Sequence, residues 1–132
     1  MPVYAAGTGV EIFPGDFVTV WNAETPTPTA TSGTAAAMSQ PVALGDSAGR
    51  ANGISVDLKF SGAPGAFEVD VMSASTDAVG NYSTVPGGVL NAVDATTFTL
   101  HFESPTVNDN FVALYMRSRT NSVSVTATIK RN

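Results

Sequence analysis

Short segments in which apolar and polar residues alternate are the feature that most constrains how this chain folds. The clearest is residues 54–60, Ile-Ser-Val-Asp-Leu-Lys-Phe, and residues 67–71, Phe-Glu-Val-Asp-Val, repeat the alternation after a turn rich in Gly, Ala and Pro. In a β-strand successive side chains point to opposite faces, so this period buries one face and exposes the other. The pattern predicts strands of a half-buried sheet.

These two segments are predicted to form one β-hairpin. The register that buries one face pairs Phe60 with Phe67, Leu58 with Val69, and Val56 with Val71. The same register places Lys59 beside Glu68 and Asp57 beside Asp70 on the exposed face. Cross-strand pairs stabilise a hairpin and fix its register, so most of these pairs favour the same alignment.

The end of the chain predicts a second hairpin, residues 111–119 and 122–130, with its turn at residues 120–121. Its buried face pairs Met116 with Val125, Leu114 with Ala127, and Val112 with Ile129. Its other face carries Phe111, Tyr115 and Arg117. Two aromatic rings and an arginine on a solvated face call for a cover. A loop of the same chain, a neighbouring strand and another subunit are the three candidates.

Further strands are predicted at residues 16–21, 41–44, 82–85, 89–93 and 96–103. Roughly seven to nine short strands predict a single all-β domain over residues 1–132, an antiparallel β-sandwich of jelly-roll type. Two segments fall outside this pattern. Residues 1–15 are predicted to be an extended N-terminal arm, and residues 22–40, rich in Pro, Thr and Ala, a long flexible loop.

Composition argues against several classes of function. The chain has no cysteine, which excludes disulfides, thiolate metal sites and a thiol nucleophile and fits synthesis in a cytoplasm. Its formal net charge of -5 argues against a nucleic-acid partner, because phosphate binding depends on Lys and Arg. No apolar run approaches the ~18 residues that cross a bilayer, and the N-terminus lacks a signal-peptide pattern, so no membrane partner is expected.

Candidate catalytic groups are few. The one histidine, His101, is predicted to be an ordinary surface residue, because it falls on the polar side of the alternation in residues 96–103. Residues 45–49, Gly-Asp-Ser-Ala-Gly, match the nucleophile-elbow pattern, which would make Ser47 and His101 a hydrolase pair. A nucleophile elbow lies between a strand and a helix, whereas a strand follows here, so these residues are predicted to form a turn. We expect no enzymatic activity, no cofactor and no metal site.

Residues 60–65, 67–71, 73–77, 111–115 and 125–131 together resemble segments of small virion proteins of tailed bacteriophages. In particular they are similar to capsid decoration (cement) proteins with a jelly-roll or β-sandwich body, over residues 54–131. The resemblance implies a structural virion protein that is made in the host cytoplasm and binds the outer capsid surface. Its partners would be the major capsid protein and its own copies, as a dimer or trimer.

Partner contacts are predicted in the N-terminal arm, in the segment that follows it and in the last hairpin. The residues are Val3, Tyr4, Ile12, Phe13, Trp21, Phe111, Tyr115, Arg117 and Arg119. The arm can add a strand to a neighbour's sheet, and the loop at residues 22–40 can become ordered on the shell. The basic residues near the C-terminus, which include Lys130 and Arg131, can meet an acidic surface or, alternatively, protect an edge strand from aggregation.

A second functional class is a receptor- or carbohydrate-binding module of a phage tail fibre or baseplate. In this alternative Trp21 and Tyr115 stack on a saccharide, as aromatic rings do in many sugar-binding sandwiches.

Overall fold

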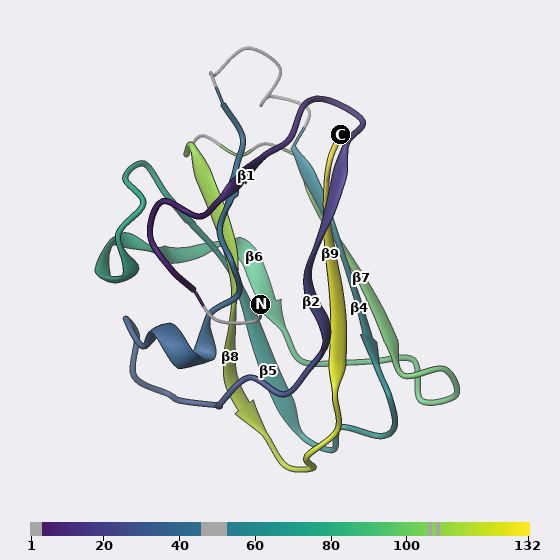
Figure 1. The fold of residues 1–132 in the computed structure, drawn as a ribbon. Helices are drawn as coiled ribbons and strands as arrows, with labels where there is room; N and C mark the ends of the chain where they lie inside the picture. Colours follow the sequence, from purple (N-terminus) through teal and green to yellow (C-terminus); the bar gives the residue numbers. More distant parts are fainter. Residues whose placement is uncertain (1–3, 46–52, 106, 108) are drawn as a thin grey trace.

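Residues 4–45, 53–105, 107 and 109–132 are described by a computed structural model, shown as a ribbon in Figure 1. Nine strands run through these residues: β1 (Val10–Glu11), β2 (Phe17–Glu24), β3 (Val42–Ala43), β4 (Ile54–Phe60), β5 (Phe67–Ala74), β6 (Ser83–Leu90), β7 (Thr99–Ser104), β8 (Phe111–Arg119) and β9 (Val125–Arg131). Two 3-10 helices, η1 (Ala35–Ala37) and η3 (Val79–Asn81), lie in the connections. The predicted all-β class is confirmed.

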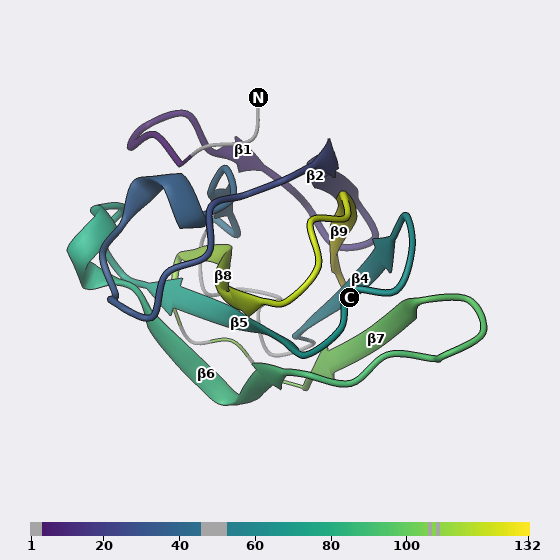
Figure 2. The same cartoon turned by 90° about the horizontal axis from the view of Figure 1, so that it is seen from below.

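The strands form two sheets packed face to face, as the view from below in Figure 2 shows. One sheet has the order β1-β3-β8-β5-β6 and the other β2-β9-β4-β7. Strand β2 pairs with β9, β3 with β8, β4 with β7, and β5 with β6, all antiparallel. The short pair of β1 and β3 is parallel. The predicted antiparallel β-sandwich is thus confirmed, apart from that one pair.

Both predicted hairpins are wrong, although their predicted buried faces are right. Strand β4 pairs with β7 and β9 in one sheet, whereas β5 pairs with β6 and β8 in the other. Strands β8 and β9 are separated in the same way. Alternation specifies which face a strand buries but not which strand it pairs with. The predicted apolar faces are therefore buried, but they meet across the core between the two sheets instead of within one sheet. The rings of Phe60 and Phe67 lie 4.9 Å apart between their centroids. Because β4 and β5 are in opposite sheets, Asp57 does not lie beside Asp70 and Lys59 does not lie beside Glu68, as the predicted hairpin required.

Two of the connections that cross between the sheets, from β4 to β5 and from β8 to β9, bind each other at one end of the sandwich. The amide of Thr120 donates to the carbonyl of Ala66 at 2.9 Å, and the amide of Asn121 donates to that of Pro64 at 3.0 Å. Gly65 has a φ of +70°, and a Cβ atom there would lie 2.9 Å from the Cβ of Thr120. Both crossings therefore pack as one unit, at the bottom of Figure 1.

The core lies between the two sheets. Its largest fully buried side chains include Trp21, Phe60, Leu44, Ile54, Leu58, Leu114, Met116 and Ile129. Phe98, Leu100 and Phe102 pack against this cluster as partly buried residues, as the alternation in residues 96–103 predicts. Burial of each large aliphatic or aromatic side chain stabilises the fold by about 1.5–3 kcal/mol, so this cluster is the main source of stability.

Residues 25–40 cover the outer face of the five-stranded sheet, beside β8 in both ribbon views. Met38 and Tyr115 are fully buried between this segment and the sheet. The amide of Ser39 donates to the carbonyl of Leu114 at 2.8 Å. Of the three candidate covers for the face that carries Tyr115, the structure has the loop of the same chain.

A polar network fixes this cover. The Tyr115 hydroxyl donates to the carbonyl of Thr31, and the Arg117 guanidinium lies 4.6 Å from the centre of the Tyr115 ring. Arg117 also donates to the carbonyl of Ala30 at 2.9 Å and contacts the Asp70 carboxylate at 2.9 Å. The predicted loop at residues 22–40 therefore differs in two ways from expectation: β2 extends through Glu24, and the remainder is packed on the sheet.

Residues 4–13 also lie on the chain's own surface rather than reaching away as an arm. Strand β1 forms the edge of the five-stranded sheet, and Ile12 is buried in the core. The Asp77 carboxylate accepts hydrogen bonds from the hydroxyls of Tyr4 and Tyr82, at 2.6 and 2.8 Å, and from the amide of Gly7 at 2.8 Å. One carboxylate thus ties the N-terminal segment to the connection between β5 and β6.

The ionisation of Asp77 sets the pH range over which this tie holds. Burial alone would raise the pKa of Asp77, but the hydrogen bonds from Tyr4, Gly7 and Tyr82 outweigh it and lower the pKa. Burial, and then the neighbouring Asp77 carboxylate, raise the pKa of both tyrosines. A carboxyl group with a lowered folded pKa stabilises the fold above its unfolded pKa of about 3.9 and loses this effect as the pH falls through the folded value.

We expect Asp77→Asn to loosen residues 4–12, because an amide cannot accept all three hydrogen bonds. The free energy of unfolding should fall by about 1–3 kcal/mol, and amide hydrogen exchange in residues 4–12 should accelerate at pH 7. The wild-type protein should show the same local acceleration only as the pH falls below about 4. Asp94→Asn, at an exposed turn carboxylate far from this segment, is the control. Unchanged exchange in Asp77→Asn would contradict the role given to the carboxylate.

Candidate functional site

The outer face of the four-stranded sheet is polar and largely exposed, in contrast to the covered face of the other sheet. Its side chains, here called the open face, are Phe17, Thr19, Ser55, Asp57, Lys59, Thr99, His101, Glu103, Thr126, Thr128 and Lys130. They face outward because the alternate residues of the same strands, such as Val56 and Leu58, are buried in the core.

Strand register brings residues far apart in the sequence together at the centre of the open face. Asp57 of β4 lies opposite His101 of β7 on one side and Thr128 of β9 on the other. Lys59, two residues along β4, lies between Thr99 and Thr126 in the same way. The side chain of β4 at each of these positions is therefore flanked by residues of both neighbouring strands.

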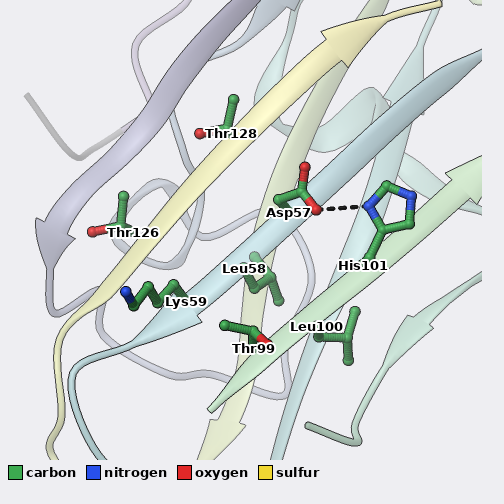
Figure 3. A pocket seen from close by; sticks show the side chains of 8 residues that line it. All are labelled: Asp57, Leu58, Lys59, Thr99, Leu100, His101, Thr126 and Thr128. Atoms are coloured by element: carbon green, nitrogen blue, oxygen red, sulfur yellow. Dashed lines mark hydrogen bonds and ion pairs between the residues drawn. The ribbon is translucent and has the colours of Figure 1, made fainter. Parts of the chain in front are cut away.

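A shallow groove of about 340 Å³ lies at this centre, and Figure 3 shows the side chains that line it. The lining residues are Asp57, Leu58, Lys59, Thr99, Leu100, His101, Thr126 and Thr128. A second hollow of about 300 Å³ adjoins it and shares Lys59 and Thr126. The two hollows are therefore neighbours along β4 and β9.

His101 lies between two carboxylates. Its Nδ1 atom is 2.6 Å from the Asp57 carboxylate, and its Nε2 atom is 3.0 Å from that of Glu103. A carboxylate only accepts hydrogen bonds, so the ring donates to both partners when it is an imidazolium, the form that this arrangement favours. The hydrogen bond to Asp57, and then that to Glu103, raise the pKa of His101. Asp57, His101 and Glu103, here called the trio, carry one net negative charge in that form.

The trio is exposed and its ring nitrogens are both engaged, so His101 has no free nitrogen to offer a metal ion. Among the described residues, no cluster of three or more His, Cys, Asp or Glu side chains has the geometry to hold a metal ion. In the same part of the chain, no helix is long and apolar enough to cross a bilayer.

Sequence reasoning placed His101 on the surface, which the structure confirms, but missed its two partners. The error follows from the wrong hairpin, because pairing β4 with β5 put Asp57 beside Asp70 and away from His101. The spacing of His101 and Glu103, two residues apart on one strand, is the local signal that places both on the same face. The contact with Asp57 can be found only from the register of β4 against β7.

Four of the predicted partner-contact residues are buried within the chain itself. Trp21 and Tyr115 have no exposed surface, and Tyr4 and Ile12 have almost none. Trp21 belongs to the core between the sheets, whereas Tyr115 lies beneath residues 25–40. The predicted aromatic platform for a saccharide is therefore wrong, because both rings are enclosed and lie on opposite sides of one sheet.

The predicted basic end of the chain is also divided by the fold. Arg117 and Arg119 lie on β8, with Arg117 held by Asp70, whereas Arg131 lies on β9, is buried and donates to the carbonyl of Ile12. Lys130 is exposed on the open face. Because β8 and β9 are in different sheets, these side chains do not form one basic surface.

Phe13 is the predicted contact residue that is well exposed, at 60%, and Phe17, which sequence reasoning missed, is 68% exposed. A tight turn joins them, in which the amide of Asp16 donates to the carbonyl of Phe13 at 2.8 Å. Phe111 is partly buried. Val3 and the predicted turn at Ser47 lie outside the described residues. Phe13 thus lies at the start of this turn and Phe17 directly after it, where β2 begins at the rim of the open face.

Comparison with known proteins gives no match: no protein-family model, no curated protein sequence and no solved structure is significantly similar to this chain.

We expect His101 to titrate above the ordinary histidine pKa of about 6.5. Because it is the one histidine of the chain, its ring protons give a single set of NMR signals for a pH titration. Asp57→Asn should lower the titration midpoint more than Glu103→Gln does, since Asp57 is the larger cause of the raised pKa. A raised folded pKa adds stability below the unfolded pKa and loses it as the pH rises through the folded value.

The control for this titration is Glu11→Gln, which removes an exposed carboxylate on β1 in the other sheet. It should leave the midpoint unchanged. A wild-type midpoint at or below about 6.5, unaffected by Asp57→Asn, would contradict the imidazolium assigned to the trio.

Proposed function

We propose that this chain is a non-enzymatic structural protein of a phage particle, with a jelly-roll fold, that binds the outer surface of the capsid. The observation that carries the proposal is the nested pairing of eight strands, β2 with β9, β3 with β8, β4 with β7, and β5 with β6. This pairing, divided into sheets of order 2-9-4-7 and 3-8-5-6, is the wiring expected of a jelly roll, an architecture that viral capsid and lectin domains use.

The distribution of covered and open surface supports a protein that binds by one side. Residues 25–40 and the N-terminal segment close the outer face of the five-stranded sheet, so the open face and its rim are available to a partner. Phe13 and Phe17 expose large apolar surface at that rim, and exposed apolar patches on small domains mark interaction sites. We therefore assign the main contact with the major capsid protein to Phe13 and Phe17, in place of the buried Trp21 and Tyr115.

Contacts between copies of the chain, as a dimer or trimer on the capsid, belong to the same proposal. Of the edge strands, β1 has only two residues and β6 contains Pro86 and two glycines, which disfavours strand addition. Strands β2 and β7 form the edges of the open sheet. The six residues of β7 pair with β4 without a register shift, whereas the pairing of β2 with β9 is irregular at two places, so β7 is the edge better suited to pair with a neighbour. Copies would then join side by side with their open faces in one plane.

The alternative, a carbohydrate-binding module of a tail fibre or baseplate, keeps one supporting observation. The groove on the open face presents threonine hydroxyls, a carboxylate and an ammonium group. It does so without aromatic side chains, so this alternative differs from the stacking site expected from the sequence.

The location of the chain in particles is the test of the proposed function. Particles purified from cells that carry the gene should contain the chain by mass spectrometry, and cryo-electron microscopy should place it on the head in many copies. Deletion of the gene should lower the temperature at which filled heads release DNA. Density on the tail would favour the alternative, and absence from the particles would contradict both.

The double variant Phe13→Ser with Phe17→Ser tests the assigned contact. Both rings are exposed, so thermal unfolding should change little, while occupancy on heads that lack the wild-type chain should fall by at least tenfold. Val89→Ser removes a similarly exposed apolar side chain on β6 of the other sheet and should bind like the wild type. Equal binding by both variants would contradict the contact.

A further inference from the structure

The central strand of the open face carries two charged groups whose hydrogen-bonding capacity is unused. Asp57 bonds His101 through one carboxylate oxygen, and its other oxygen has no partner among the described residues. The Lys59 ammonium likewise has no hydrogen bond or ion pair within the described part of the chain. Both side chains line the groove in Figure 3. The groove thus offers a fixed acceptor and a free donor.

Hydroxyl groups flank these two charges on both sides. Thr126 accepts a hydrogen bond from the amide of Ala23 at 3.1 Å, so its own proton remains available to donate. Thr128 on the same strand and Thr99 on β7 border the groove as well. Leu58 and Leu100 complete the lining, but their side chains pack in or against the core. The lining therefore combines an anion, a cation, and hydroxyls that donate or accept.

This combination discriminates between classes of ligand. An anion such as phosphate would gain one ammonium group but would face the Asp57 carboxylate. A wholly apolar ligand would remove Asp57 and Lys59 from water without replacing their hydrogen bonds, which is unfavourable. A sugar ring has hydroxyls that donate to a carboxylate and accept from an ammonium group, and C–H faces that suit the aliphatic parts of threonine and lysine side chains.

We propose that the groove binds a neutral saccharide, with the free oxygen of Asp57 as acceptor and Lys59 and Thr126 as donors. Its volume of about 340 Å³ falls at the lower end of the range for small-molecule sites and suits one sugar ring. The adjoining hollow of about 300 Å³, which shares Lys59 and Thr126, suits a second ring linked to the first. The preferred ligand is accordingly a saccharide of two linked rings.

His101 acts as a positioning residue in this site. It holds one oxygen of Asp57, and Glu103 holds the other side of the ring, so the Asp57 carboxylate has less rotational freedom to lose when a ligand binds its other oxygen. The charged groups near His101 are Asp57 and Lys59 on β4 and Glu103 on β7, while Thr128 on β9 is uncharged. Loss of one proton leaves a single ring N–H, which the shorter contact at Nδ1 keeps on Asp57, and it removes the hydrogen bond from Nε2 to Glu103. The ring is then held from one side only, so binding should weaken modestly as the pH rises above the His101 pKa.

The test is a titration of the isotope-labelled full chain with neutral disaccharides such as maltose, cellobiose and lactose, followed by NMR, together with a glycan array. At least one neutral disaccharide should shift the signals of β4, β7 and β9 and saturate at millimolar concentration, about what a few hydrogen bonds on an open face support. Absence of any neutral saccharide binding on the array and up to about 20 mM in solution would overturn the proposal. Binding of acidic saccharides alone would also overturn it.

Variants assign the roles. Asp57→Asn should weaken binding by about tenfold or more, because a charge-assisted hydrogen bond is lost, and Thr126→Val by about threefold. His101→Gln should weaken binding by a few-fold and abolish its pH dependence, a readout that a merely structural histidine would not change. Glu11→Gln is the matched control and should bind like the wild type. Equal affinity in Asp57→Asn and Glu11→Gln would overturn the assigned site.

This inference does not rest on the proposed function. Saccharide binding concerns the centre of the open face, whereas the capsid contact is assigned to Phe13 and Phe17 at its rim. A chain that occupies heads but binds no saccharide would overturn the inference alone, and one that binds a saccharide but is missing from particles would overturn the proposed function alone.

Discussion

The fold depends on the contact between two apolar sheet faces, neither of which is stable in water alone. Strands β4 and β9 on one side and β5 and β8 on the other provide most of the facing side chains. Strand β4 is thus separated from β5, and β8 from β9, by the connections at residues 61–66 and 120–124, which cross the end of the sandwich and bind each other.

The outer face of one sheet is covered and that of the other is exposed, because the chain has enough additional length to cover one of them. Residues 25–40 bury Tyr115 and Met38 on the five-stranded sheet, and Arg117 with Asp70 joins the cover to the strand beneath. The N-terminal segment closes the same side through Asp77. The four-stranded sheet receives no such cover among the described residues. Any partner that needs a broad, accessible surface is thereby directed to the open face and its rim.

The class of the fold and the inward face of most strands could be predicted from the sequence, because both depend on local alternation. Val56 and Leu58 illustrate this, as they are buried whichever strand lies beside β4. Pairing could not be predicted, because the same alternation in residues 67–71 fits a hairpin and a crossing equally well. A loop of the same chain was one of the predicted covers of Tyr115, but that residues 25–40 provide it could not be predicted, because this segment has no apolar period. The contact of Asp57 with His101 depends on pairing and could not be predicted either.

The trio on the open face contributes more to the orientation of the Asp57 carboxylate than to the stability of the fold. Ion pairs between exposed side chains contribute about 0–1 kcal/mol, since water solvates the separated charges almost as well. Asp57, His101 and Glu103 are all exposed, so their attraction adds little to folding. What the arrangement changes is the freedom of Asp57, whose carboxylate is held at one oxygen while the other is left for solvent or ligand. A carboxylate with one oxygen already hydrogen-bonded has less freedom to lose when its other oxygen binds a ligand. This lowers the entropy cost of binding a partner rich in hydroxyl groups.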